Sequence, residues 1–142
     1  MSYEEKNTWS LGIIAVLGYA AYLVMAFLVG DGPLDPDTYI WPMVWAIGGG
    51  IVAGIVAGIL IGMASGGSMR RGATMIDRRD REIGWAASRV GNSFIVIGGI
   101  GALILCFVDA PHVLIANTLY LGFVLAAILE TTTKIVIYRR GF

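Results

Sequence analysis

Charged residues and cysteine are both scarce in this chain of 142 residues. Only 14% of its residues are charged, compared with about 25% in a typical soluble domain. The single cysteine, Cys106, excludes an internal disulfide, and no Cys/His cluster is present to hold zinc. Four prolines are too few for a Pro-rich disordered chain. Ten basic residues balance ten acidic ones, so the overall charge predicts no nucleic-acid partner.

Apolar residues dominate the remainder. They make up 57% of the chain, and the mean hydropathy is +0.77. Four apolar stretches reach the roughly 20 residues needed to cross about 30 Å of hydrocarbon. Because backbone groups find no water partners in lipid, these stretches predict helices. We therefore expect one all-α domain over residues 1–142, an integral membrane four-transmembrane-helix bundle with spans at 9–29, 40–64, 87–108 and 113–138 and a middle loop at 65–86.

The placement of the basic residues predicts the orientation of the bundle. The loops at 30–39 and 109–112 contain acids but no lysine or arginine. All ten basic residues lie toward the two termini or the middle loop: Lys6, Arg70, Arg71, Arg78, Arg79, Arg81, Arg89, Lys134, Arg139 and Arg140. By the positive-inside rule, both termini and the middle loop are expected in the cytoplasm.

The short connection between the third and fourth spans predicts a tight antiparallel hairpin. Asp109 is expected to cap the N-terminus of the fourth span, with Pro111 just inside that helix. In the first span, the hydroxyls of Tyr19 and Tyr22 each require a partner within the membrane.

Small residues recur at four-residue spacing along the second span. Such spacing lets another backbone approach closely. Two interpretations follow, namely packing inside the chain and association with a second copy or another membrane protein. Glycines of the third span, among them Gly91, Gly98 and Gly101, are a candidate internal partner for this row. The row comprises Ala46, Gly50, Gly54, Gly58, Gly62 and Gly66.

The middle loop is rich in arginine with interleaved acids. Thr74 and Asp77 have the spacing of a capping signal, which predicts a short amphipathic helix that starts near Thr74 and leads into the third span. The loop is expected either to lie on anionic lipid headgroups or to dock another protein, such as a cytoplasmic regulator. Contact with headgroups is the simpler interpretation, and the interleaved acids are the argument for docking. The charged residues concerned are Arg70, Arg71, Asp77, Arg78, Arg79, Asp80, Arg81 and Glu82.

The second half of the chain resembles a family of small prokaryotic membrane proteins of unknown function (DUF2178-like). The stretch 77–83, followed by Ala87-Ser88-Arg89, resembles the "DERD…I" signature of that family, with Arg78 where the family commonly has Glu. The ending Ile137-Tyr138-Arg139-Arg140-Gly141 is similar to its "YYRRG" ending. The resemblance implies a prokaryotic plasma-membrane protein with a sensing or sequestering role. It implies no catalytic activity.

Glu130 is the one acid embedded within a predicted span. Intramembrane acids are candidates for proton carriers or cation sites. Lys134 follows at i+4 in the favourable order, so a structural ion pair is the simpler interpretation. Asn92 and Ser93, at a comparable depth in the third span, are candidates for hydrogen bonds to Glu130 or to the threonines that follow it.

No catalytic or cofactor motif occurs in the sequence, so we expect a non-enzymatic protein without cofactor or metal. The favoured function is association, through the glycine-rich helix face and the charged loop, as an accessory, regulatory or sensing subunit. The alternative is a small proton-coupled transporter or channel that uses Glu130. Four-span multidrug exporters are similar in length and glycine content, but they carry an essential Glu in the first span, and here that span has no acid.

Overall fold

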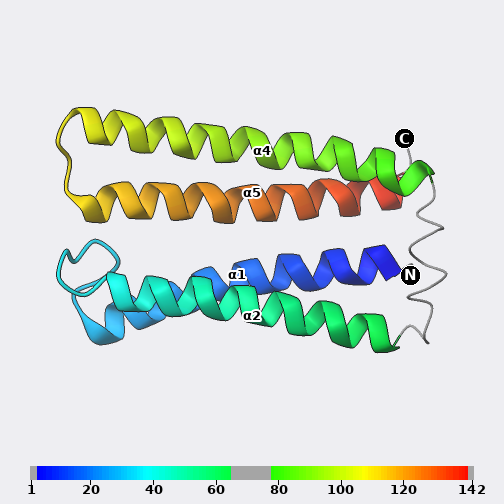
Figure 1. Ribbon diagram of the computed structural model, residues 1–142, viewed down its shortest axis with the longest axis horizontal. Helices are drawn as coiled ribbons and strands as arrows, with labels where there is room; N and C mark the ends of the chain where they lie inside the picture. The colour runs from blue at the N-terminus through cyan, green and yellow to red at the C-terminus, as the bar shows by residue number, and fades with distance from the viewer. Residues whose placement is uncertain (1–2, 65–77, 141–142) are drawn as a thin grey trace.

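The computed structural model describes residues 3–64 and 78–140, and these form four helices (Figure 1). Each helix is long and apolar enough to cross a membrane. This confirms the predicted all-helical architecture with four candidate membrane spans for the described residues, and it supports a multi-pass membrane protein. The predicted start of a loop helix near Thr74, and the residues Gly66, Arg70, Arg71 and Asp77, lie outside the described ranges. The helices are α1 (Tyr3–Val29), α2 (Ile40–Ala64), α4 (Arg78–Phe107) and α5 (His112–Arg140).

The described helices lie in an open row in the order α2, α1, α5, α4. The extensive contacts are those of α4 with α5, α1 with α2 and α1 with α5. Figure 1 shows two antiparallel hairpins, α1/α2 and α4/α5, which meet along α1 and α5. The N- and C-terminal ends of the described chain lie at the same end of the helices, and the two short connections lie at the opposite end (Figure 1). Helices α2 and α4 are therefore the edges of the row, and each leaves much of its surface free.

A small core lies near the two short connections, where α1, α2 and α5 meet. Its buried members are Tyr22, Ala26, Met43, Ala46, Tyr120 and Val124. The Tyr22 and Tyr120 rings meet edge to face with centroids 5.1 Å apart, and Tyr19 lies 5.6 Å from Tyr120. Such edge-to-face pairs stabilise by about 0.5–1.5 kcal/mol beyond their buried area. Most large apolar side chains elsewhere are exposed, as expected for surfaces that face lipid.

Glycines bring α4 and α5 into backbone contact. A Cβ added at Gly98 would lie 2.9 Å from the Cα of Gly122, and one added at Gly91 would lie 3.2 Å from the carbonyl oxygen of Ala126. A Cβ at Gly101 would contact the Thr118 methyl at 3.2 Å. The prediction that these third-span glycines pair with the second span was therefore wrong. These glycines pack against α5 instead, because the short connection places α5 directly beside α4.

Asp109 ends α4 and does not cap α5 as predicted. Its φ is 51°, in the left-handed region. The Asp109 N–H donates to the carbonyl of Cys106, and the Ala110 N–H donates to that of Leu105. These two bonds form a Schellman motif, in which the residue after the helix end is left-handed. The first bonds of α5 go instead to the carbonyl of Pro111, which accepts from Leu114 and Ile115.

Replacing Asp109 with glycine is expected to stabilise the protein by about 0.5–1 kcal/mol. Glycine adopts a left-handed conformation without the steric cost that a Cβ brings. The measurement is the Tm in detergent micelles. As a control, Val108→Gly, at the preceding helix-terminal position, is expected to lower the Tm. A lower Tm for Asp109→Gly would contradict this account of the turn.

Candidate functional site

A polar network ties the first connection to α1 and α5. Tyr22 is fully buried, and its hydroxyl donates to Asn117 Oδ1 at 2.6 Å. Asn117 Nδ2 in turn donates to the carbonyls of Pro33 and Val113, both at 2.8 Å. The partner that the sequence required for Tyr22 is thus a side chain of α5, 95 residues further along the chain. Asn117 was not among the predicted residues, because an isolated Asn in an apolar helix carries no spacing signal.

The connection between α1 and α2 is built around Asp35. The Asp35 carboxylate accepts hydrogen bonds from the Thr38 hydroxyl at 2.7 Å and from the backbone N–H groups of Asp37 and Asp31. These bonds lower the pKa of the Asp35 carboxyl, and the bond from Thr38 has the largest effect. Gly30 lies directly against this turn, where an added Cβ would collide with the Thr38 hydroxyl. The connection is therefore a specific structure that is anchored to the core through the Pro33 carbonyl.

Replacing Asn117 with leucine is expected to destabilise the protein by about 1–3 kcal/mol. The change removes the short partner of the buried Tyr22 hydroxyl and the donor to Pro33. The double variant Tyr22→Phe/Asn117→Leu is expected to recover part of this loss, since it also removes the Tyr22 hydroxyl, which Asn117→Leu leaves with only its longer bond of 3.3 Å to the Pro33 carbonyl. Thermal unfolding in detergent measures both. Equal losses in the single and double variants would contradict the proposed hydrogen bond.

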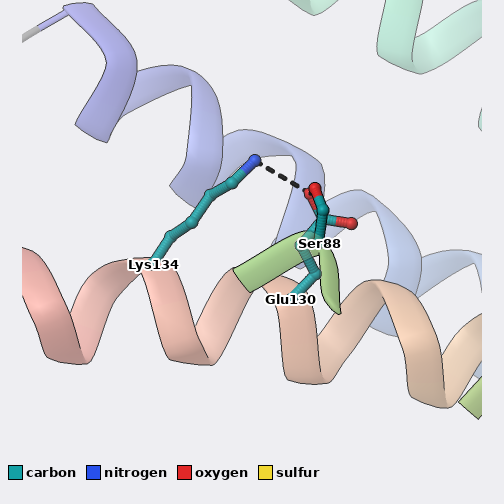
Figure 2. Close-up of polar contacts among 3 residues, drawn as sticks. All are labelled: Ser88, Glu130 and Lys134. Atoms are coloured by element: carbon teal, nitrogen blue, oxygen red, sulfur yellow. Dashed lines mark hydrogen bonds and ion pairs between the residues drawn. The ribbon is translucent and has the colours of Figure 1, made fainter. Parts of the chain in front are cut away.

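Glu130 and Lys134 form the ion pair that their spacing predicts. Lys134 Nζ lies 2.9 Å from Glu130 Oε1, and the Ser88 hydroxyl of α4 donates to the same oxygen at 3.2 Å. Figure 2 shows the two α5 side chains on the same side of the helix, with Ser88 beside the carboxylate. The side chains are only partly exposed, 26% for Lys134 and 35% for Glu130. The pair therefore lies at the α4–α5 contact.

The other polar residues predicted at this site lie elsewhere. The Ser93 hydroxyl donates to the backbone carbonyl of Arg89 in its own helix, and Asn92 is exposed. Neither of these two residues is seen to bond Glu130 among the described contacts. Ser88 takes that place, three residues before Gly91, where an added Cβ would lie 3.2 Å from the Glu130 side chain. This three-residue spacing along the small-residue face of α4 is the signal that sequence reasoning missed.

The charged residues from Arg78 to Glu82, which were predicted in the middle loop, lie in the first turns of α4. Asp80 Oδ1 accepts a hydrogen bond from the Tyr138 hydroxyl at 3.0 Å, so this acid helps to join the two helices. Arg78 and Glu82 form a long, exposed ion pair at 3.9 Å, and Arg81 is exposed. Arg79 lies in the first turn of the same helix. Ile83 and Ala87, four residues apart on this helix, are both fully buried.

The small-residue row of α2 lies mostly open. Ala46 is buried near Gly18 of α1, but a Cβ added at Gly50 or Gly58 would have no neighbour within 4 Å. Gly54 would meet only the end of the Leu11 side chain, at 3.7 Å. Because an α-helix has 3.6 residues per turn, a four-residue row turns by about 40° at each step and winds away from α1. Gly62 is partly exposed further along α2.

Comparisons of the chain with models of known protein families, with curated proteins and with solved structures found no match.

Proposed function

We propose that this chain is a non-enzymatic membrane protein that acts by association, with a second copy or another membrane protein, through the glycine row of α2. One contrast supports the proposal. A Cβ added at Gly91, Gly98 or Gly122 would meet the backbone of the facing helix in the α4–α5 hairpin, whereas one added at Gly50 or Gly58 of α2 would meet no described atom within 4 Å. Glycine in a helix interior costs about 0.5–1 kcal/mol relative to alanine. A row of open glycines is therefore best explained by a partner helix that approaches closely.

The geometry of the row favours a helix as the partner. A partner helix that packs along small residues at i and i+4 crosses at a right-handed angle of about −40°, as in GxxxG dimers. In lipid, such pairs are held by van der Waals contact and not by a hydrophobic driving force, so small residues are what permit them. The large exposed side chains on the rest of α2, such as Ile55 and Leu60, suit contact with lipid.

Cysteine cross-linking in native membranes tests this association. In a Cys106→Ser background, Gly58→Cys is expected to give a cross-linked species of defined mass, a homodimer or a complex with one partner. Leu60→Cys is the matched control, because it is exposed on the same helix about 200° around the axis. Equal cross-linking at both positions, or none at either, would contradict the proposal.

Both termini and the loop at 65–86 are proposed to face the cytoplasm of a prokaryotic cell. The concentration of basic residues toward these segments supports this orientation. The cytoplasmic charged loop is then available to lipid headgroups or to a regulator, and the family resemblance of the second half points to a sensing role. In a Cys106→Ser background, an impermeant maleimide added to intact cells is expected to label Asp37→Cys. Lys6→Cys is expected to react only after permeabilisation, and the reverse pattern would overturn the orientation.

Glu130 supports a second candidate function, a small proton-coupled transporter or channel. It is an intramembrane acid whose side chain keeps 35% of its surface exposed. Purified protein in liposomes should then carry a proton-coupled flux that Glu130→Gln abolishes. The ion pair with Lys134 and the Ser88 bond favour the structural role instead. Under that role, Glu130→Gln changes stability and no flux.

A further inference from the structure

A second surface, separate from the α2 row, lies between α1 and α5. It is an apolar groove of about 370 Å³, lined by the N-terminal half of α1 and the C-terminal half of α5. Trp9, Ile13 and Val16 line it from α1, and Ile128, Thr132 and Ile135 from α5. Its volume falls within the roughly 300–1,000 Å³ of small-molecule sites.

The lining of the groove suits a hydrocarbon chain. The Thr132 hydroxyl donates to the carbonyl of Ile128 in its own helix at 2.7 Å, so it offers no free donor to a ligand. Trp9, Ile13 and Val16 are exposed along the groove and are therefore accessible from the lipid. The groove spans about two turns of each helix, roughly 12 Å at 1.5 Å per residue. This is too short for a transmembrane helix to lie along but long enough for part of an acyl chain.

A cation stands at the end of the groove toward the termini. Arg139 continues the α5 stripe of Ile128, Thr132 and Ile135 by one turn, and its guanidinium lies 6.0 Å from the centre of the Trp9 ring. This cation–π contact fixes the guanidinium beside the groove without using an N–H donor. Lys6 and Arg140 are exposed at the same end of these helices. At this end, α1 and α5 together carry three basic residues, Lys6, Arg139 and Arg140, and two acids, Glu4 and Glu5.

We propose that this groove binds an anionic phospholipid, with one acyl chain against Trp9, Ile13 and Val16 and the phosphate held by the Arg139 guanidinium. Guanidinium groups bind phosphate through paired N–H donors, and basic sites between transmembrane helices at the membrane surface recognise anionic headgroups. The apolar groove and the adjoining cation match the two parts of such a lipid.

Fluorescence quenching of Trp9 tests the proposal directly. The other three tryptophans, Trp41, Trp45 and Trp85, are exposed and are replaced by Phe, so that Trp9 alone emits. The protein is placed in phosphatidylcholine bilayers that contain a small share of lipid brominated near the carbonyl end of the acyl chain. Brominated phosphatidylglycerol is expected to quench Trp9 more strongly than brominated phosphatidylcholine.

Two variants separate the parts of the site. Arg139→Gln is expected to lower the preference for phosphatidylglycerol about fivefold, as roughly 1 kcal/mol per basic residue implies. Arg81→Gln, an exposed arginine on α4 at the same end, is the control and should keep the preference. Val16→Phe, which fills the groove, should reduce quenching by both lipids, whereas Val24→Phe, exposed on α1 beyond the groove, should not.

Three results would overturn the proposal. Equal quenching by the two lipids would show that the groove does not select an anionic headgroup. A preference for phosphatidylglycerol that survives Arg139→Gln would show that Arg139 does not bind the headgroup. Protection of Trp9 from both brominated lipids would show that a protein segment, such as a second copy, covers the groove instead.

Discussion

Replacing Gly98 with leucine is expected to destabilise the α4–α5 hairpin by about 3 kcal/mol or more. A Cβ at this position would lie 2.9 Å from the Cα of Gly122, so a leucine collides with backbone and not with a movable side chain. Overpacking of side chains alone typically costs about 1–3 kcal/mol, and here the two helices themselves must separate. The measurement is the unfolding transition in mixed micelles with increasing SDS.

Gly99 provides a matched control for this prediction. It is the next residue of the same helix, and a Cβ there would have no neighbour within 4 Å. Gly99→Leu therefore makes the same change in composition and helix propensity without the collision. Its transition is expected to stay within about 0.5 kcal/mol of the native protein, or to rise slightly because glycine is a poor helix former. Similar losses for both variants would show that α4 and α5 do not meet at Gly98.

Replacing Lys134 with methionine is expected to cost about 1–3 kcal/mol. Among the described residues, the change leaves the Glu130 carboxylate with only the Ser88 hydroxyl as its partner, in a helix long and apolar enough to cross a membrane. An unpaired charge in such a position is expensive, because its solvation by water is lost while its counter-ion is gone. Thermal unfolding in detergent at neutral pH measures the loss.

The double variant Glu130→Leu/Lys134→Met distinguishes a structural pair from a stability effect of lysine alone. It removes both charges, so it is expected to recover most of the stability that Lys134→Met loses. Ser88→Ala is expected to have a smaller effect, about 0.5–1 kcal/mol, since it removes one neutral donor. A double variant that is less stable than Lys134→Met would contradict the pairing.

The helices and the ion pair could be predicted from the sequence because both depend on residues close together in the chain. Twenty or more apolar residues in succession require a helix in lipid, wherever that helix packs. Glu130 and Lys134 lie four residues apart, and helix geometry alone brings such side chains together.

The turn at Asp109 could not be assigned in the same way. An Asp before an apolar run is compatible with an N-cap of the following helix and with a left-handed residue that ends the preceding one. The connection is too short for the sequence to separate the two functions. The backbone hydrogen bonds of Asp109 and Ala110 to α4 show that Asp109 ends the preceding helix.

By itself, the sequence determined the number and length of the apolar spans, the distribution of charge between their ends and the contacts within single helices. The tertiary structure decided which faces meet: Gly98 against Gly122, Ser88 beside Glu130, Tyr22 on Asn117, and the glycines of α2 left open. The reason is the solvent. In water, the apolar face of a helix is the buried one, whereas lipid is as apolar as the core, so the apolar pattern does not mark which face is buried. Only the packing of the helices against one another shows it.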